Sequence, residues 1–408
     1  MVRKLILLVL LSLFMSSSCV STSNTPTKTR NTDWPMYLHD SANRSSLATR
    51  GSLPRRLIWT RKPFAEASAQ YDEELPTSTI SGLMTNGNAL YLFGEDGFLR
   101  SLSVDSGKEY RNYYPAHISI FGSPSPVTNG DQVLCGFSPG SITALDINTF
   151  TPVWKQSVPS SFITSTQLVV GGQDIYFGTN DGTLHAWSIR NGKKLWSKKL
   201  QGLSQESQLP CIAQGKVYQI SGGGIDGSYH VYCLDQESGS IIWEVAAKGD
   251  PMQTPVMFSD NHLFYGSDES SKATIVCLDP ANGKVIWTRD YPGSNIASPI
   301  ASSGSILAAM NTVEETGQGR KWQLLSIDIT GHSIGSVEGN GNVTTPVVAS
   351  SKFASFATDN NEIYFINTHN MKVSKVLPVP GRNPFSIVLT KDKVLVGCED
   401  GTIACFGN

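Results

Sequence analysis

Four copies of one pattern decide the fold: ALDINTFTPVW at 144–154, AWSIRNGKKLW at 186–196, CLDQESGSIIW at 233–243 and CLDPANGKVIW at 277–287. Each copy ends in Trp, and successive tryptophans are 42, 47 and 44 residues apart. Gly192, Gly239 and Gly283 hold the same place in three copies, where positive φ allows a tight turn between two strands. Phe150 takes that place in the first copy, so we expect its turn to differ.

Hairpin signals lie between these copies. Four Asp-Gly pairs separate strand-like runs, at 96–97, 181–182, 226–227 and 400–401. They predict type I′ turns, which need positive φ at both central residues. Four further apolar runs follow Ser-Pro or Thr-Pro, at 125–126, 254–255, 298–299 and 345–346, because proline is tolerated at a strand's first residue. Each unit therefore holds four antiparallel strands in about 44 residues, the pattern of a β-propeller blade.

Eight such units account for the chain. They begin near Thr79, Pro126, Thr166, Leu209, Pro255, Pro299, Pro346 and Ser386. The last lacks its outer strand, and we expect the isolated strand around Trp59 to supply it and remove an open edge. The predicted fold class is all-β, an eight-bladed β-propeller of four-stranded antiparallel blades closed by an N-terminal strand, with its ring at about 56–408. Seven blades is the alternative if the first unit is misread.

The recurring residues are predicted to be structural. The tryptophans Trp59, Trp154, Trp196, Trp243 and Trp287 should pack between neighbouring blades. The aspartates Asp146, Asp235, Asp279 and Asp328 should accept hydrogen bonds from turn backbone. Gly335 and Ser374 stand where the sixth and seventh units would carry Trp.

Composition excludes several classes of protein. Thirty-two basic and 34 acidic residues give a net charge of −2, without the positive excess that nucleic-acid binding requires. Only 16% of residues are charged, which argues against a coiled coil. The eight Trp, 13 Tyr and 16 Phe provide too much apolar surface for a disordered chain.

The N-terminus predicts export. Arg3 and Lys4 precede an apolar run, 5–15, and small residues, which indicates a signal peptide at 1–18. The following Cys19 resembles the lipidated cysteine of bacterial lipoproteins; ordinary signal cleavage with an incidental Cys19 is the alternative. Residues 19–33 are then the lipidated cysteine and a flexible tether, and 34–408 form the propeller.

The Trp-ending repeats, together with Asp33-Trp34-Pro35-Met36-Tyr37, resemble the pyrroloquinoline-quinone-like (PQQ-like) repeat family over roughly 33–408. That family includes quinone-dependent dehydrogenases and non-catalytic lipoproteins. In size and layout the chain is similar to the lipoproteins of the outer-membrane β-barrel assembly machinery. The resemblance implies a scaffold on the periplasmic face of an outer membrane, anchored through its N-terminal lipid and bound to other envelope proteins.

The sequence favours binding over catalysis. A dehydrogenase of this family would need a catalytic Asp, a Ca²⁺ site and commonly a Cys-Cys pair, and the chain has no Cys-Cys. We therefore expect no catalytic residue, no cofactor and no metal, and a monomer that binds no nucleic acid. The alternatives are a PQQ-dependent dehydrogenase or quinone-binding sensor, and a propeller that binds surface polysaccharide or peptide.

Loop lengths suggest a partner-binding face. The longer loops fall in connections that emerge on one face of a propeller, and function concentrates on loops held by a rigid scaffold. The candidate partner-binding residues are Asp226, Asp268, Glu269, Glu314, Glu315, Arg320 and Lys321. The alternative is that these loop lengths vary without functional consequence.

Overall fold

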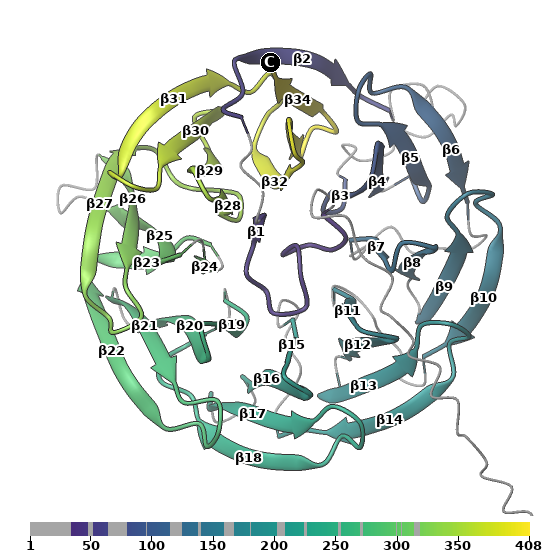
Figure 1. Cartoon of the computed structure of the whole chain (residues 1–408), viewed down its shortest axis with the longest axis horizontal. Helices are drawn as coiled ribbons and strands as arrows, with labels where there is room; N and C mark the ends of the chain where they lie inside the picture. Colours follow the sequence, from purple (N-terminus) through teal and green to yellow (C-terminus); the bar gives the residue numbers. More distant parts are fainter. Residues whose placement is uncertain are drawn as a thin grey trace, which may run out of the picture.

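The computed structural model describes residues 34–47, 52–63, 80–94, 96–114, 125–137, 140–158, 167–179, 181–201, 209–223, 227–251, 254–269, 272–298, 300–302, 304–313 and 319–408. Eight antiparallel sheets stand around one axis, which confirms the eight-bladed propeller and makes the seven-bladed alternative wrong (Figure 1). Within these residues, no helix is long and apolar enough to cross a membrane.

Each blade runs from a short inner strand to an outer strand. The first four blades are β3 (Met84–Asn86), β4 (Ala89–Phe93), β5 (Leu99–Ser103) and β6 (Glu109–Tyr113); β7 (Val127–Thr128), β8 (Gln132–Phe137), β9 (Ser141–Asp146) and β10 (Pro152–Ser157); β11 (Val169–Gly171), β12 (Asp174–Gly178), β13 (Thr183–Ser188) and β14 (Lys194–Lys199); and β15 (Cys211–Ala213), β16 (Lys216–Gly222), β17 (Tyr229–Asp235) and β18 (Ile241–Ala246).

The second half of the ring repeats this order. Its blades are β19 (Met257–Ser259), β20 (His262–Glu269), β21 (Lys272–Leu278) and β22 (Val285–Pro292); β24 (Ala301–Ser302), β25 (Ile306–Val313), β26 (Arg320–Ile327) and β27 (Ser333–Asn340); β28 (Val348–Ser350), β29 (Phe353–Thr358), β30 (Glu362–Asn367) and β31 (Lys372–Pro378); and β32 (Pro384–Leu389), β33 (Val394–Cys398), β34 (Ile403–Gly407) and β2 (Arg56–Arg61). Blade 6 also pairs β23 (Ser294–Ile296) with β25.

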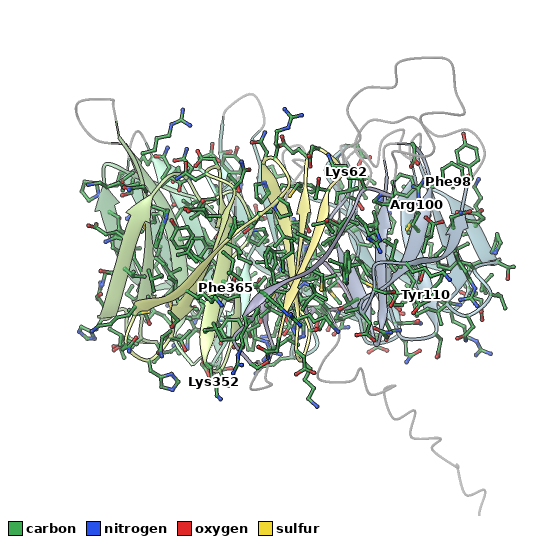
Figure 2. The ribbon with its side chains drawn as sticks, turned by 90° about the horizontal axis from the view of Figure 1, so that it is seen from above. Lys62, Phe98, Arg100, Tyr110, Lys352 and Phe365 are labelled. Atoms are coloured by element: carbon green, nitrogen blue, oxygen red, sulfur yellow. The ribbon has the colours of Figure 1, made fainter. Side chains whose placement is uncertain are left out.

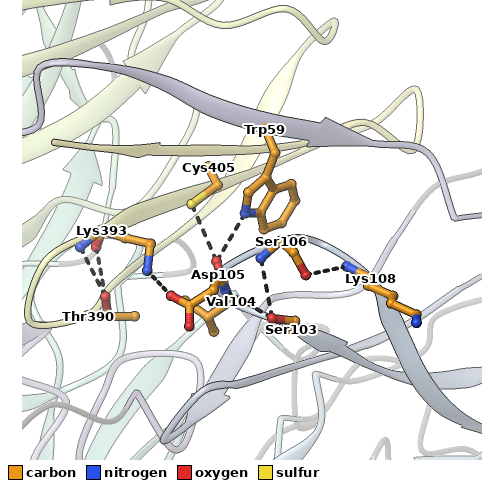
Figure 3. A network of polar contacts seen from close by, with 9 residues as sticks. All are labelled: Trp59, Ser103, Val104, Asp105, Ser106, Lys108, Thr390, Lys393 and Cys405. Carbon is orange, nitrogen blue, oxygen red and sulfur yellow. Dashed lines mark hydrogen bonds and ion pairs between the residues drawn. The ribbon is translucent and has the colours of Figure 1, made fainter.

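The N-terminal strand closes the ring as predicted. β2 pairs antiparallel with β34 and becomes the outer strand of blade 8. The Trp59 indole N–H donates to the carbonyl of Val104 in blade 1 at 3.0 Å, and Lys393 of blade 8 pairs with Asp105 (Figure 3). The two ends of the chain are thus tied together, and the eighth blade has no missing strand.

Every recurrent tryptophan lies on the next blade's turn. The indole N–H of Trp154 donates to the Ile189 carbonyl at 3.0 Å, and a Cβ added at Gly192 would lie 2.6 Å from the Trp154 ring. The same arrangement recurs at four other junctions, where a tryptophan covers the turn glycine of the next blade: Trp59 over Gly107, Trp196 over Gly239, Trp243 over Gly283 and Trp287 over Gly331. The turn glycine therefore serves two purposes, because it adopts positive φ and leaves room for the indole.

Where the tryptophan is missing, the turn supplies a larger side chain. Gly335 takes the tryptophan's position in blade 6, and the facing turn of blade 7 carries Met371 in place of glycine. Met371 has φ 49° and is 7% exposed. In blade 2, Phe150 is likewise buried with φ 61°. Our expectation that the Phe150 turn differs was therefore wrong, because the same left-handed turn forms with a side chain that fills the space.

Two other local expectations need correction. In blade 7, the tryptophan's position belongs to Lys375, which pairs with Phe365 as Trp243 pairs with Cys233; it does not belong to Ser374. The Asp-Gly hairpins at 96–97, 181–182 and 400–401 are not type I′ turns, because Gly97, Gly182 and Gly401 have positive φ while their aspartates do not. Only one left-handed residue is needed in these longer turns.

The lead-in segment 34–47 lies at the centre of the ring (Figure 1). Its backbone carbonyls accept hydrogen bonds from the inner strands of successive blades, at Thr85, Thr128, Ile212, Phe258, Ser302 and Ala349. Its last two residues form β1 (Ser46–Leu47), which pairs in parallel with β28. This segment therefore links six of the eight inner strands and lines the axis with the chain's own backbone.

Replacing Trp59 should weaken ring closure. The Trp59→Ala variant loses a buried indole and its hydrogen bond, so we expect its free energy of unfolding to fall by about 3 kcal/mol. Chemical unfolding followed by circular dichroism measures this. Leu57→Ala on the same strand, where the side chain is 41% exposed, should cost less than about 1 kcal/mol; equal losses would contradict the role of Trp59.

We expect that a Trp–Gly pair can replace Gly335 and Met371 at the junction of blades 6 and 7. Gly335→Trp alone overpacks against Met371, and Met371→Gly alone leaves a cavity; each should cost about 1–3 kcal/mol. The double variant recreates the pair found at five other blade junctions, so its loss should be smaller than the sum of the two by at least about 1 kcal/mol. Additive losses in a double-mutant cycle would contradict this account.

Candidate partner-binding face

The propeller has two unlike faces. Turns between the first two strands of each blade lie on one face, as Lys352 does, and hairpins between the second and third strands lie on the other (Figure 2). We call the second of these the loop face. Figure 2 shows Lys62, Phe98 and Arg100 toward the loop face. The candidate residues that the structure describes also belong to hairpins on this face.

Asp268 links two blades. Its side chain accepts a hydrogen bond from the Ile296 backbone N–H at 2.8 Å, and its own backbone forms a bridge with Asp250. Burial raises the pKa of Asp268; the bond from Ile296 opposes this rise and the nearby Asp250 adds to it. Asp268 therefore shapes the loop face by holding blade 5 against blade 6.

Glu269 belongs to an exposed ionic network. Lys272 lies 3.1 Å from Glu269 and 3.5 Å from Asp290, and Lys248 approaches Asp290 at 3.6 Å. The hydrogen bond to Glu269 is the main cause that raises the pKa of Lys272. Lys248 follows the outer strand of blade 4, so the network also spans two blades. Alternating charges here favour polar contacts with a partner.

Arg320 lies on the neighbouring blade. Its side chain is 69% exposed, and its guanidinium reaches Asp359 of blade 7 at 3.5 Å. Asp359 is held in place by the backbone N–H of Asn342 at 2.8 Å and its side-chain amide at 3.0 Å. Lys321 follows Arg320 in β26 and pairs across the hairpin with Thr312. Arg320 thus presents an accessible positive charge on a rigid support.

Four predicted site residues lie outside the described residues: Cys19, Asp226, Glu314 and Glu315. Their roles in lipidation and partner binding stay predictions. The described Asp268 and Glu269 lie on blade 5, next to blade 6 with Arg320 and Lys321. The assignment of these seven residues to a binding site is likewise still a prediction.

The loop face carries groups that sequence reasoning missed. Arg100 is buried in an ion pair with Asp96, lies 3.4 Å from Glu109 and stands over the Phe98 ring. The ring of Phe98 is 4.8 Å from that of Tyr114. The available sequence signal was an arginine in the strand that follows the Asp96-Gly97 pair, because a hairpin folds this strand back toward the aspartate.

The repeat aspartates lie on the opposite face, in the turns before the outer strands. Asp146 accepts hydrogen bonds from the Thr149 and Asn148 backbone, which lower its pKa. Hydrogen bonds from Ser238 lower the pKa of Asp235, and those from Thr330 and His332 lower that of Asp328. Asp279 likewise accepts from the Ala281 backbone N–H at 2.8 Å. Local turn geometry accounts for all four carboxylates.

Few groups on the described chain suit chemistry. The six described cysteines are buried and unpaired, and burial raises the pKa of Cys277 to about 12, so its thiol stays protonated near neutral pH. His185 is 4% exposed, and burial lowers its pKa to about 4. Among the residues described, no three His, Cys, Asp or Glu side chains come together as a metal site.

The ion pair between Lys62 and Asp400 on the loop face should make the free energy of unfolding depend on pH. Burial alone would raise the pKa of Asp400, but hydrogen bonds from Lys62 at 2.8 Å and from Thr402 outweigh it and lower the pKa. The stabilisation is therefore present above the ordinary carboxyl pKa and is lost as pH falls. Lys62→Met should cost about 0.5 kcal/mol at pH 7, with the difference vanishing in acid.

Urea unfolding at a series of pH values measures this difference. Lys352→Met, at an exposed lysine on the opposite face, is the control and should leave the pH profile unchanged. A Lys62→Met difference that persists undiminished at low pH would contradict the assignment.

Known proteins share this fold. A family model described as outer membrane protein assembly factor BamB matches residues 55–224 and 227–406. BamB of Taylorella asinigenitalis is 32% identical over 188 residues, or 41% of this chain and 45% of that protein. The chain thus spans less than half the length of this curated relative.

Solved structures agree on the fold. The crystal structure of BamB from Moraxella catarrhalis has a TM-score of 0.62 at 13% identity, covering 86% of this chain and 99% of that one. A europium-containing methanol dehydrogenase has a TM-score of 0.66 at 12% identity, covering 90% of each chain. At such identities these likenesses show the fold alone. Because the family model matches both halves of the ring, this chain belongs to the family of outer membrane protein assembly factor BamB.

Proposed function

We propose that the chain is a non-catalytic, protein-binding scaffold of the cell envelope that works in outer-membrane protein assembly. The family match over nearly the whole ring carries this proposal. The name of the matched relatives, outer membrane protein assembly factor, supplies the process. The N-terminal sequence supports export and lipidation at Cys19, which would hold the propeller at the membrane.

The interior of the ring supports binding over quinone chemistry. Segment 34–47 hydrogen-bonds the inner strands of six blades along the axis. The described residues also lack a cluster of three metal-ligating side chains that could hold a cofactor's cation. The described part of the axis is occupied by the chain's own backbone, which supports the binding role.

The loop face supports a role in holding a partner. Its exposed charges include both signs, with Glu269 and Lys272 on blade 5 and Arg320 on blade 6. Links between blades, such as the Asp268 side chain on the Ile296 N–H, keep these groups at fixed separations. A surface already in its bound geometry loses less entropy on association. The mechanism is positional: the anchor fixes the height above the membrane, and the loop face fixes the partner.

Reversing the charge of Arg320 tests this proposal. An affinity-tagged chain in its own host should copurify with the outer-membrane assembly machinery after mild crosslinking. Arg320→Glu should reduce that recovery several-fold, because a charge at the rim of an interface now repels its partner group. Recovery is measured by quantitative mass spectrometry, together with the amounts of outer-membrane β-barrel proteins.

Lys352→Glu is the matched control, since it reverses an exposed charge on the opposite face. It should leave both quantities unchanged. Recovery of no envelope protein with the wild-type chain would contradict the scaffold. Recovery equal for wild type and Arg320→Glu would remove the loop face as the binding surface.

A further inference from the structure

The outer strands differ in how their free edges are protected. Each outer strand pairs on one side only within the described chain, and proteins guard such edges against pairing with other chains by Lys, Pro and other interruptions. Six of the eight carry Lys, Arg or Pro, at Arg56 and Arg61, Arg111, Pro152 and Lys155, Lys194, Lys198 and Lys199, Arg289 and Pro292, and Lys372, Lys375 and Pro378. The outer strand β27 carries Gly335 and Gly339, which weaken a strand. β18 of blade 4, with sequence IIWEVA, carries none of these residues.

The side chains of β18 are accessible and mainly apolar. Ile241 is 38% exposed and Ile242 is 48% exposed. Trp243 and Val245 are half-buried, and Glu244 is its one charged residue. The adjacent outer strand β14 has the opposite character, with lysines at 194, 198 and 199. β18 is therefore the outer strand that offers the fewest obstacles to another strand.

Backbone groups on β18 point away from the ring. The Ala247 N–H donates to the Tyr229 carbonyl at 2.8 Å, so these two residues form a hydrogen-bonded pair. Such pairs alternate along an antiparallel ladder. Val245, opposite Val231, is therefore also bonded to β17, while the N–H and C=O groups of Glu244 and Ala246 face outward. An incoming strand would find these groups at ordinary ladder spacing.

The two sides of β18 have different chemistry. Trp243 and Val245 lie toward blade 5, where both cover Gly283. Glu244 lies toward blade 3, because it accepts a hydrogen bond from the Tyr232 hydroxyl at 3.0 Å, and this hydroxyl also binds the Gln201 backbone. A strand added beside β18 would place alternate side chains next to apolar groups and next to a carboxylate.

We propose that β18 is a docking edge for an extended segment of another polypeptide, in which apolar residues alternate with basic ones, added as a fifth strand to blade 4. This inference rests on the proposed protein-binding function and gives it a second surface, away from the loop face. Main-chain pairing requires an extended polypeptide, and Glu244 favours a cationic neighbour. A second copy of β18 would bring another Glu244 and no basic residue.

A designed peptide tests the edge directly. The probe is a fluorescein-labelled ten-residue peptide of alternating Val and Lys, titrated with the purified full-length chain and followed by fluorescence anisotropy. Ala246→Pro removes one outward N–H and leaves the bonds to β17 in place, so the affinity should fall roughly tenfold. Ile242→Lys gives β18 the guard that its neighbours have and should weaken binding as well.

Matched variants on other blades distinguish a loss of peptide binding at β18 from a loss of folding. Lys199→Pro removes an outward N–H from β14, since Leu200 donates to Gly182 there, and Ile286→Lys alters a side chain 49% exposed on β22. Both should bind the peptide as wild type does, with unchanged circular dichroism. A peptide N-methylated along one edge, or one with Glu in place of Lys, should bind at least roughly tenfold more weakly.

Several results would overturn the proposal. These are no measurable binding, equal binding by wild type and Ala246→Pro, equal loss in Lys199→Pro, or equal affinity for the Glu peptide. Dimerisation of the chain in sedimentation experiments that Ala246→Pro abolishes would assign the edge to a second copy and also overturn it. The peptide assay contains no assembly machinery, so its outcome is independent of the copurification that tests the proposed function.

Discussion

The ring depends on one repeated contact, in which a tryptophan of one blade covers the glycine turn of the next. The indole supplies a large apolar surface between two sheets, and its N–H donates to a turn carbonyl of the next blade. Neither blade could bury this surface alone. Because each contact joins consecutive blades, five of them fix the angle between sheets around most of the circle.

The space between neighbouring blades is filled by a large side chain even in the repeats that lack the tryptophan or the glycine. Where the outer strand has Gly335, the next turn has Met371, so the side chain comes from the other partner. Phe150 fills the corresponding turn in blade 2 and faces Tyr91 of blade 1, with ring centroids 6.2 Å apart. Packing density has to be met at every junction, whereas the blade that provides the atoms can change.

A rigid frame of this kind separates stability from binding. The tight turns on one face hold the Trp-binding glycines and the repeat aspartates, so their sequences are constrained by geometry. On the loop face Asp268 also joins two blades, whereas exposed charges such as Arg320 have no turn to shape and can suit a partner. The inner strands are already engaged by segment 34–47. Surfaces available for recognition are therefore the loop face and the outer edges, where β18 lacks the guards of its neighbours.

The sequence by itself determined the number of blades, the closure by the strand around Trp59 and the roles of the recurrent Trp and Asp, because these follow from spacing that repeats every blade. It placed the tryptophan position of blade 7 at Ser374, although the spacing from Asn367 to Lys375 equals that from Asp235 to Trp243. It misjudged Phe150 because a left-handed turn at a non-glycine residue depends on the space that the neighbouring blade leaves for the side chain. Only the tertiary structure revealed the buried Arg100 ion pair, the interblade role of Asp268 and the path of segment 34–47. Asp268 and segment 34–47 contact residues of other blades that lie far away in the chain, and the local pattern around Arg100 does not encode its burial.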